Sequence, residues 1–202
     1  VTCEPLLPPD VTAKEALSPG QYMHGQEMDI AVMFADLRGF TKLSESKLPF
    51  DVVFMLNQYF QSMGSAIEVS GGRVDKFIGD GIMALFGVSG NNEDGANQAL
   101  KAAHEMSLRL KKMNEQLKND LKVPLTVGIG IHHGPAIVGT MGYGTATQIT
   151  AIGDTVNTAS RLEALTKDHG VQLLVSSEIE NATQIDLRSF EQIEVGVRGR
   201  TQ

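Results

Sequence analysis

Residues 34–41, Phe34-Ala35-Asp36-Leu37-Arg38-Gly39-Phe40-Thr41, are the stretch that predicts both the fold and the chemistry of this chain. An apolar run leads into it, so we predict a buried strand over Met28 to Asp36. The strand ends on the carboxylate of Asp36, and Arg38 to Thr41 predict a turn with free backbone N–H groups. A carboxylate suits a divalent metal ion, and free amides suit phosphate oxygens.

A second acid lies in a similar setting, in Lys76-Phe77-Ile78-Gly79-Asp80-Gly81. Two apolar runs, Val74 to Ile78 and Ile82 to Phe86, flank Gly79-Asp80-Gly81 and predict a hairpin. Either aspartate alone would more often simply cap a turn. Two of them at strand ends, each followed by glycine within three residues, favour a two-metal site for phosphoryl transfer.

The composition narrows the classes of protein. With 202 residues and 42% hydrophobic residues, the chain is long and apolar enough to form a domain with a full core. A net charge of −7 argues against a nucleic-acid partner. The single cysteine, Cys3, excludes an intrachain disulfide, as expected in the cytoplasm, and no stretch predicts a membrane span or signal peptide. Proline-rich residues 1–26 predict a linker from an upstream module, and residues 27–202 a catalytic domain within a longer protein.

The rest of the pattern predicts alternating strands and helices. A helix is expected from Pro49 to Gly71-Gly72 and another along an apolar stripe from Ala96 to Leu117. The further predictions are strands at 125–131 and 136–138 around His132 to Pro135, a glycine-rich segment at 139–147, a helix at 155–167, a strand at 173–175 and weaker strands near the end. This order predicts an α+β, ferredoxin-like fold, with an antiparallel-rich sheet and helices on one face.

Two polar residues of the last predicted helix are further candidates. Asn157 and Arg161 lie four residues apart and share a face opposite the apolar side of the helix. A permanently charged, fork-shaped guanidinium suits the charge on a transferring phosphoryl group, although a surface ion pair is the commoner role of a lone arginine. His132 and His133 are adjacent, so they would point to opposite faces of a strand. No Cys or second His cluster is near them in the sequence, which argues against a zinc site.

Three segments together resemble the class III nucleotidyl cyclases. They are the stretch at 34–41, Gly72-Arg73-Val74-Asp75-Lys76-Phe77-Ile78-Gly79-Asp80-Gly81, and Ala151-Ile152-Gly153-Asp154-Thr155-Val156-Asn157-Thr158-Ala159-Ser160-Arg161-Leu162-Glu163. They occur in the family's order, and the resemblance covers roughly residues 28–200. One departure is the glycine-rich segment Gly142 to Thr147, where the family has a dimer-contacting hairpin arm.

The resemblance implies an enzyme that forms a 3′,5′-cyclic nucleotide and pyrophosphate from a nucleoside triphosphate. It implies two Mg²⁺ or Mn²⁺ ions on Asp36, Asp80 and the backbone carbonyl of Leu37. The remaining roles that it implies are phosphate binding by backbone amides near Gly39, Phe40 and Thr41, base recognition by Lys76 and Thr150, and ribose positioning and transition-state stabilisation by Asn157 and Arg161.

The resemblance also implies a homodimer with two shared sites, one chain supplying the metal ligands and its partner the other groups. Lys76 and Asp80 are at most ~13 Å apart at strand rise, so an extended nucleotide could span both, but a two-fold dimer lets each serve a different pocket. Lysine donates hydrogen bonds only and suits the ring nitrogen of adenine, which favours ATP. Thr150 can accept from the adenine amino group but can also donate. The alternatives are a guanylyl cyclase and a catalytically silent nucleotide-binding module.

Overall fold

The computed structural model describes residues 25–88, 94–121, 123–143 and 145–194. Residues 1–24 of the predicted linker lie outside this part. The elements follow in the order β1 (Gln26–Arg38), α2 (Phe40–Ser46), α3 (Pro49–Val69), β2 (Arg73–Ile78), β3 (Gly81–Phe86), α4 (Gly95–Gln116), β4 (Thr126–Tyr143), β5 (Ala146–Ile152), α5 (Asp154–Asp168), β6 (Leu173–Val175) and α6 (Ser177–Ala182).

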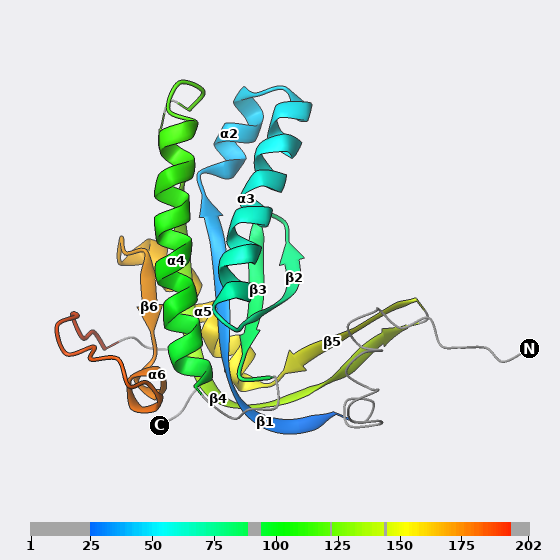
Figure 1. The fold of residues 1–202 in the computed structure, drawn as a ribbon, viewed down its shortest axis with the longest axis vertical. Helices are drawn as coiled ribbons and strands as arrows, with labels where there is room; N and C mark the ends of the chain where they lie inside the picture. The colour runs from blue at the N-terminus through cyan, green and yellow to red at the C-terminus, as the bar shows by residue number, and fades with distance from the viewer. Residues whose placement is uncertain (1–24, 89–93, 122, 144, 195–202) are drawn as a thin grey trace, which may run out of the picture.

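The strands form one sheet in the spatial order β2-β3-β1-β4-β5, and every neighbouring pair on this path is antiparallel. β6 joins the far side of β4 in the parallel direction. A β-α-β-β-α-β chain with strand order 2-3-1-4 is ferredoxin-like, so the predicted α+β fold is confirmed. Figure 1 shows β4 and β5 curving away from the other strands as a long arm.

Both faces of the sheet are buried, because β1 carries an apolar run with no alternation. Ala31, Met33 and Ala35 face a core formed with α3 and α4. Ile30 and Val32 face the opposite side, where β5 and α5 contribute Ile149 and Ala159. The expectation of helices on one face is therefore wrong: α3 and α4 cover one face, and α5 packs on the other (Figure 1). A continuous apolar run is what a strand buried on both faces requires.

The two long helices match their predictions, with one difference. α3 begins at Pro49 and ends before Gly71, whose φ of 88° suits glycine. Phe50 and Val53 share the helical spacing of the buried residues, yet they are 88% and 57% exposed. The reason is that the first turns of α3 extend past the end of β1 (Figure 1).

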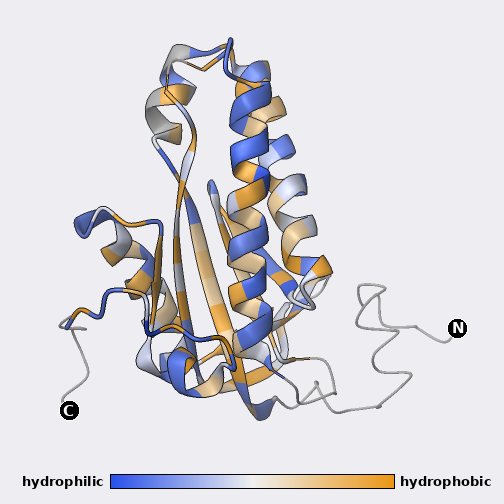
Figure 2. Ribbon diagram, turned by 60° about the vertical axis from the view of Figure 1, so that its left-hand side comes forward, coloured by the Kyte–Doolittle hydropathy of each residue, from blue (hydrophilic) through white to orange (hydrophobic). Residues whose placement is uncertain are grey.

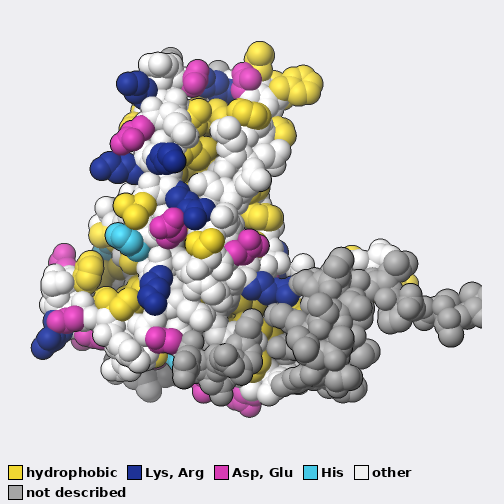
Figure 3. Space-filling view, viewed as in Figure 1, with side chains coloured by type: hydrophobic (Ala, Val, Ile, Leu, Met, Phe, Trp, Pro, Cys, Tyr) yellow, Lys and Arg dark blue, Asp and Glu magenta, His cyan; other side chains and the backbone are white. Residues whose placement is uncertain are grey.

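The outer face of α4 is the solvated surface that its basic residues predict. Lys101, Lys111 and Lys112 are exposed, and Arg109 donates to Glu105 at 2.7 Å. Figure 2 shows hydrophilic segments along α4 and hydrophobic ones along the central strands. On the face seen in Figure 3, lysine and arginine side chains alternate with acidic ones. No helix of the described residues has the length and apolar character to cross a membrane.

Three sequence predictions about β4, β5 and α2 need correction. β4 runs without a break through His132 to Pro135, because β1 pairs with it along its whole length. The glycine-rich segment does not depart from the family's hairpin arm, because β4 continues to Tyr143 and pairs with β5. The turn after Arg38 is only Gly39, with a φ of 77°, and α2 follows at once.

The C-terminal part also differs from its prediction. Weaker strands were expected there, but residues 176–194 hold the short helix α6 and no strand. Residues 195–202 lie outside the described part. α6 packs on the α3–α4 face of the sheet through Ile179, a single apolar anchor that gives no periodic signal in the sequence.

Candidate active site

The two predicted aspartates lie together at one edge of the sheet. Asp36 is the last residue of β1 that pairs with β3, and its partner is Gly81. Asp80 immediately precedes Gly81 in the β2–β3 turn. A Cβ at position 81 would lie 3.2 Å from an oxygen of Asp36, so the glycine leaves room for that carboxylate. The tight hairpin therefore brings both acids to the end of β1.

A cavity of about 200 Å³ opens beside Asp36. Its wall includes Ser160 and Glu163 from α5, together with residues of β1 and β3. Glu163 was not predicted as a site residue. One signal could have found it, because Glu163 lies four residues after Ala159 and three before Thr166, both fully buried. An acid on the buried side of a helix is unusual unless it has a partner or a role.

The acids of this cavity ionise with difficulty. Burial raises the pKa of Asp36 and the Asp80 carboxylate raises it further, whereas the Arg38 guanidinium and a hydrogen bond from the Leu37 amide lower it. Burial also raises the pKa of Glu163 to about 7, with Asp36 raising it and Arg38 lowering it. Arg38 lowers the pKa of both Asp36 and Glu163, and its Nη2 also donates a hydrogen bond to the Val171 carbonyl at 2.6 Å. The cavity thus holds an excess of negative charge.

Tyr59 of α3 adds a buried hydroxyl beside these acids. Within the described residues its oxygen has no hydrogen-bond partner. Burial raises the pKa of Tyr59, and the charges of Asp36, Asp80 and Glu163 raise it further. The tyrosine is therefore neutral and adds no negative charge. The described residues contain no group of three or more His, Cys, Asp or Glu side chains placed to hold a metal ion, so a cation here would rely on two carboxylates.

The two predicted base-recognition residues meet at a third residue, Asp75. Lys76 Nζ lies 3.2 Å from Asp75 Oδ2, and Thr150 Oγ1 donates to the same oxygen at 2.8 Å. β2 and β5 are opposite ends of the strand order, yet the curved arm brings them into contact. Asp75 belongs to the second family-like segment, and neither the pattern nor the resemblance predicts a role for it. The sequence gives Asp75 no distinctive signal, because β2 also carries the charged residues Arg73 and Lys76.

α5 presents Asn157 and Arg161 on one side, as predicted. The helix lies very close to β4 because Gly130 has no side chain, and a Cβ there would overlap the backbone of Glu163 and Ala159. Asn157 is exposed. Arg161 is half-buried, and its Nη1 is buried without a hydrogen-bond partner in the described part of the chain. The described residues thus give Arg161 no ion pair, so the surface-pair alternative has no support here.

The predicted phosphate-binding segment is the start of α2. Gly39 is the N-cap in a left-handed conformation, and no side chain caps the helix. The amides of Phe40 and Thr41 belong to the first turn, whose N–H groups have no acceptor within a helix. Leu37 lies next to the predicted metal-binding residue Asp36, since the Leu37 amide donates a hydrogen bond to the Asp36 carboxylate.

Comparison with known proteins decides the family. The model of the adenylate and guanylate cyclase catalytic domain matches residues 23–202. The chain belongs to this family. The cyclase domain is 40% identical over 154 residues to an adenylate cyclase of Anabaena cylindrica, covering 74% of this chain and 30% of the relative. It is 34% identical over 151 residues to adenylate cyclase 1 of Rhizobium meliloti, covering 75% and 23%. The chain therefore spans less than a third of the length of these curated relatives.

Solved structures agree with the fold of this cyclase domain. The guanylyl cyclase Cya2 has a TM-score of 0.78 and 33% identity, covering 88% of this chain and 89% of that one. The adenylyl cyclase CyaB from P. aeruginosa has a TM-score of 0.68 and 32% identity, covering 78% and 81%. Similar structures thus include enzymes named for either nucleotide.

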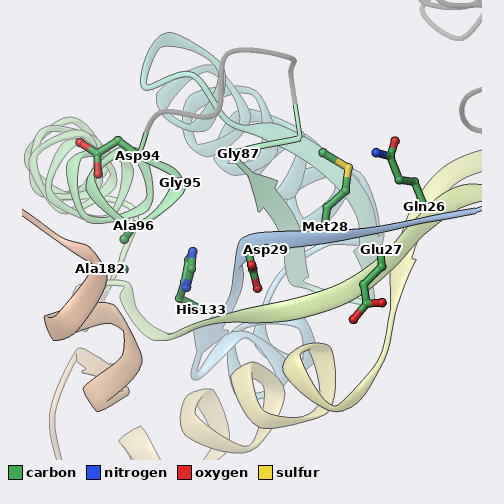
Figure 4. A pocket seen from close by; sticks show the side chains of 10 residues that line it. All are labelled: Gln26, Glu27, Met28, Asp29, Gly87, Asp94, Gly95, Ala96, His133 and Ala182. Atoms are coloured by element: carbon green, nitrogen blue, oxygen red, sulfur yellow. The ribbon is translucent and has the colours of Figure 1, made fainter.

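A second, larger cavity of the cyclase domain lies away from these residues. It measures about 500 Å³ and is bordered by β1, β4 and the start of α4. Figure 4 shows Asp29 of β1 and His133 of β4 beside each other at this cavity. None of the residues predicted for metal, phosphate or base binding lines it. The candidate active site is therefore the cavity at Asp36.

Proposed function

We propose that this cyclase domain is an adenylyl cyclase, which converts ATP to 3′,5′-cyclic AMP and pyrophosphate in a site shared by two copies of the chain. The observation that carries the choice of ATP is the convergence of Lys76 and Thr150 at one place. A donor-only ammonium matches the ring-nitrogen acceptor of adenine, and a hydroxyl can accept from its amino group. The similarity to two adenylate cyclases supports the same choice.

Asp36 and Asp80 would hold two Mg²⁺ or Mn²⁺ ions, with the backbone carbonyl of Leu37. The residues fit such ions, because burial and the nearby Asp80 carboxylate raise the pKa of Asp36, and a bound cation would favour the charged form of both acids. Magnesium keeps several waters and substrate phosphates, so two protein carboxylates suffice. When bound, the ions would supply charge neutralisation for the triphosphate and a lower pKa for the ribose hydroxyl.

Other residues bind and orient the rest of the nucleotide. The backbone amides at Gly39, Phe40 and Thr41 would donate hydrogen bonds to the triphosphate oxygens, since helix N-termini favour anions. Asn157 would hold the ribose for in-line attack of its 3′-oxygen on the α-phosphorus. The Arg161 guanidinium, whose Nη1 is buried without a partner in the described chain, would donate to the charge that develops on the phosphoryl group.

Two features support the two-chain arrangement, namely the placement of the predicted site residues and the exposed apolar surface. Large apolar side chains lie exposed around the start of α3 and at the end of β2, and extensive exposed apolar surface is typical of interaction sites. They are Leu48, Phe50, Val53, Phe54, Phe77 and Ile78. A partner chain would cover such surface. The β4–β5 arm supplies the element with which this family contacts its partner. An upstream regulatory domain and a cytoplasmic location stay predictions.

Product analysis tests the proposal. The purified domain is incubated with ATP or GTP, each with Mg²⁺ or Mn²⁺, and the products are separated. We expect cyclic AMP and pyrophosphate from ATP, and none from Asp36→Ala or Asp80→Ala. Both variants should melt at or above the wild-type temperature, because each removes one of two repelling charges. Asp168→Ala, an exposed acid at the end of α5, serves as the matched control.

Two results would overturn the proposal. A folded wild-type domain that binds nucleotide but forms no cyclic product would be the silent module. Cyclic GMP as the dominant product would make it a guanylyl cyclase.

A further inference from the structure

Asp75 occupies an irregular and fully buried position beside the base-recognition residues. The register between β2 and β3 shifts between Val74 and Lys76, so Asp75 is the extra residue of a β-bulge. Bulges commonly re-aim a side chain near a functional site. The Asp75 side chain has no exposed surface, and its Oδ1 has no hydrogen-bond partner within the described residues. Its Oδ2 therefore makes the polar contacts that compensate its burial.

The hydrogen bond from Thr150 settles what its hydroxyl can offer to a nucleotide. A threonine hydroxyl has one hydrogen and two lone pairs. Thr150 Oγ1 is the donor in its 2.8 Å hydrogen bond to Asp75 Oδ2. The hydrogen is thereby used, and the hydroxyl is left with lone pairs alone. From the sequence alone, the Thr150 hydroxyl could either donate to the base or accept from it. Because its hydrogen bonds to Asp75, it can only accept from the base.

Lys76 keeps its own polarity in the same contact. One of the three N–H groups of its ammonium points to Asp75 Oδ2 at 3.2 Å, which leaves two for a ligand. The side chain is 34% exposed, so a nucleotide can reach it. The pair thus offers one acceptor and one donor. Adenine presents the complementary amino donor and ring-nitrogen acceptor, whereas guanine presents a carbonyl acceptor and a ring N–H donor and mismatches both.

We propose that Asp75 is a positioning residue that sets the base specificity of the cyclase. It binds the Thr150 hydrogen, holds the Lys76 ammonium beside it, and so makes the pair complementary to adenine and not to guanine. The inference rests on the proposed function, because it assumes that Lys76 and Thr150 contact the base. Without the carboxylate, the Thr150 hydroxyl is free to rotate and to donate to the guanine carbonyl.

The test compares kcat/KM for ATP and for GTP in wild type and in Asp75→Asn. We expect the ATP-to-GTP ratio to fall by about tenfold or more, on the scale at which mismatched buried polar groups discriminate between substrates. A merely structural role would lower both values together and leave the ratio unchanged. Asp168→Asn makes the same chemical change at an exposed position and should keep the wild-type ratio.

Variants of Thr150 keep the proposal testable even if Asp75→Asn does not fold. Thr150→Val preserves the shape but removes the acceptor, so it should lower the ratio, whereas Thr150→Ser should preserve it. In the double variant Asp75→Asn with Thr150→Val, the loss should be smaller than the product of the two single losses, since Asp75 acts in part through Thr150.

The outcomes separate this inference from the proposed function. A wild-type domain that forms no cyclic AMP, or that prefers GTP, defeats the proposed function itself. A wild-type domain that prefers ATP, with an unchanged ratio in folded Asp75→Asn or in Thr150→Val, overturns the role of Asp75 alone. Fully multiplicative losses in the double variant overturn it as well.

Discussion

Replacing Glu163 by glutamine tests whether the cavity at Asp36 carries an excess of negative charge. Glu163 has a pKa of about 7 in the folded protein against 4.5 as its ordinary value, so the folded state holds a proton that the unfolded state has lost. A group whose pKa is raised on folding contributes stability at low pH that disappears as the pH rises through the folded pKa. The metal-free protein should therefore lose stability between pH 4.5 and 7.

The size of the effect follows from the same values. At 1.36 kcal/mol for each pKa unit, the upper limit is roughly 3.4 kcal/mol. Because Glu163 is only half-buried, solvent screening reduces this to about 1–2 kcal/mol. For a domain of this size, that corresponds to roughly 3–6 °C in melting temperature. The Glu163→Gln side chain cannot ionise, so the variant should not lose this stability of about 1–2 kcal/mol as the pH rises.

The assay is thermal unfolding in EDTA at pH 5 and pH 8. Relative to wild type, Glu163→Gln should gain about 3–6 °C more at pH 8 than at pH 5. Glu115→Gln, an exposed carboxylate on α4, is the matched control. Added Mg²⁺ should raise the wild-type melting temperature at pH 8, since a ligand of the folded state stabilises it. An equal difference between wild type and variant at both pH values would refute the excess of charge.

Three further predictions concern the shared site, the packing of α5 and the base. Mixing Asp36→Ala and Arg161→Ala chains, each inactive alone, should restore about a quarter of wild-type activity, because half of randomly formed dimers hold one intact site; mixed dimers that stay inactive would exclude the division of labour. Gly130→Ala should destabilise the domain by roughly 1–3 kcal/mol in denaturant titrations, since its Cβ would overlap the backbone of α5; unchanged stability would contradict that packing. Lys76→Glu should depress kcat/KM for ATP far more than for GTP, and Thr150→Ala should do so more mildly; an unchanged ratio in Lys76→Glu would show that the lysine does not contact the base.

The sequence predicted those parts of the site that depend on local pattern. Asp36 and Asp80 meet because a strand and a tight hairpin are both visible as apolar runs with a glycine-rich turn. Asn157 and Arg161 share a face because helical periodicity places them there. Each of these predictions needs only the geometry of one or two neighbouring elements.

The parts that the sequence did not predict depend on contacts between distant segments. Glu163 lines the cavity at Asp36 because α5 packs on the face of the sheet opposite α3 and α4. Asp75 accepts a hydrogen bond from Thr150 because the curved arm brings Thr150 of β5 next to β2. The sequence did not predict the hairpin arm, because a glycine-rich segment has no alternating strand pattern and the arm forms through pairing between β4 and β5. Local propensity gives way to tertiary pairing in such segments.

The most direct test of the central claim is a competition between the two nucleotides. Equal concentrations of ATP and GTP are given to the wild-type domain with Mg²⁺, and the ratio of cyclic AMP to cyclic GMP at early times reports the ratio of the two kcat/KM values. With Lys76 as donor and Thr150 as acceptor, cyclic AMP should exceed cyclic GMP by about tenfold or more. Equal amounts of both products, or an excess of cyclic GMP, would contradict the account.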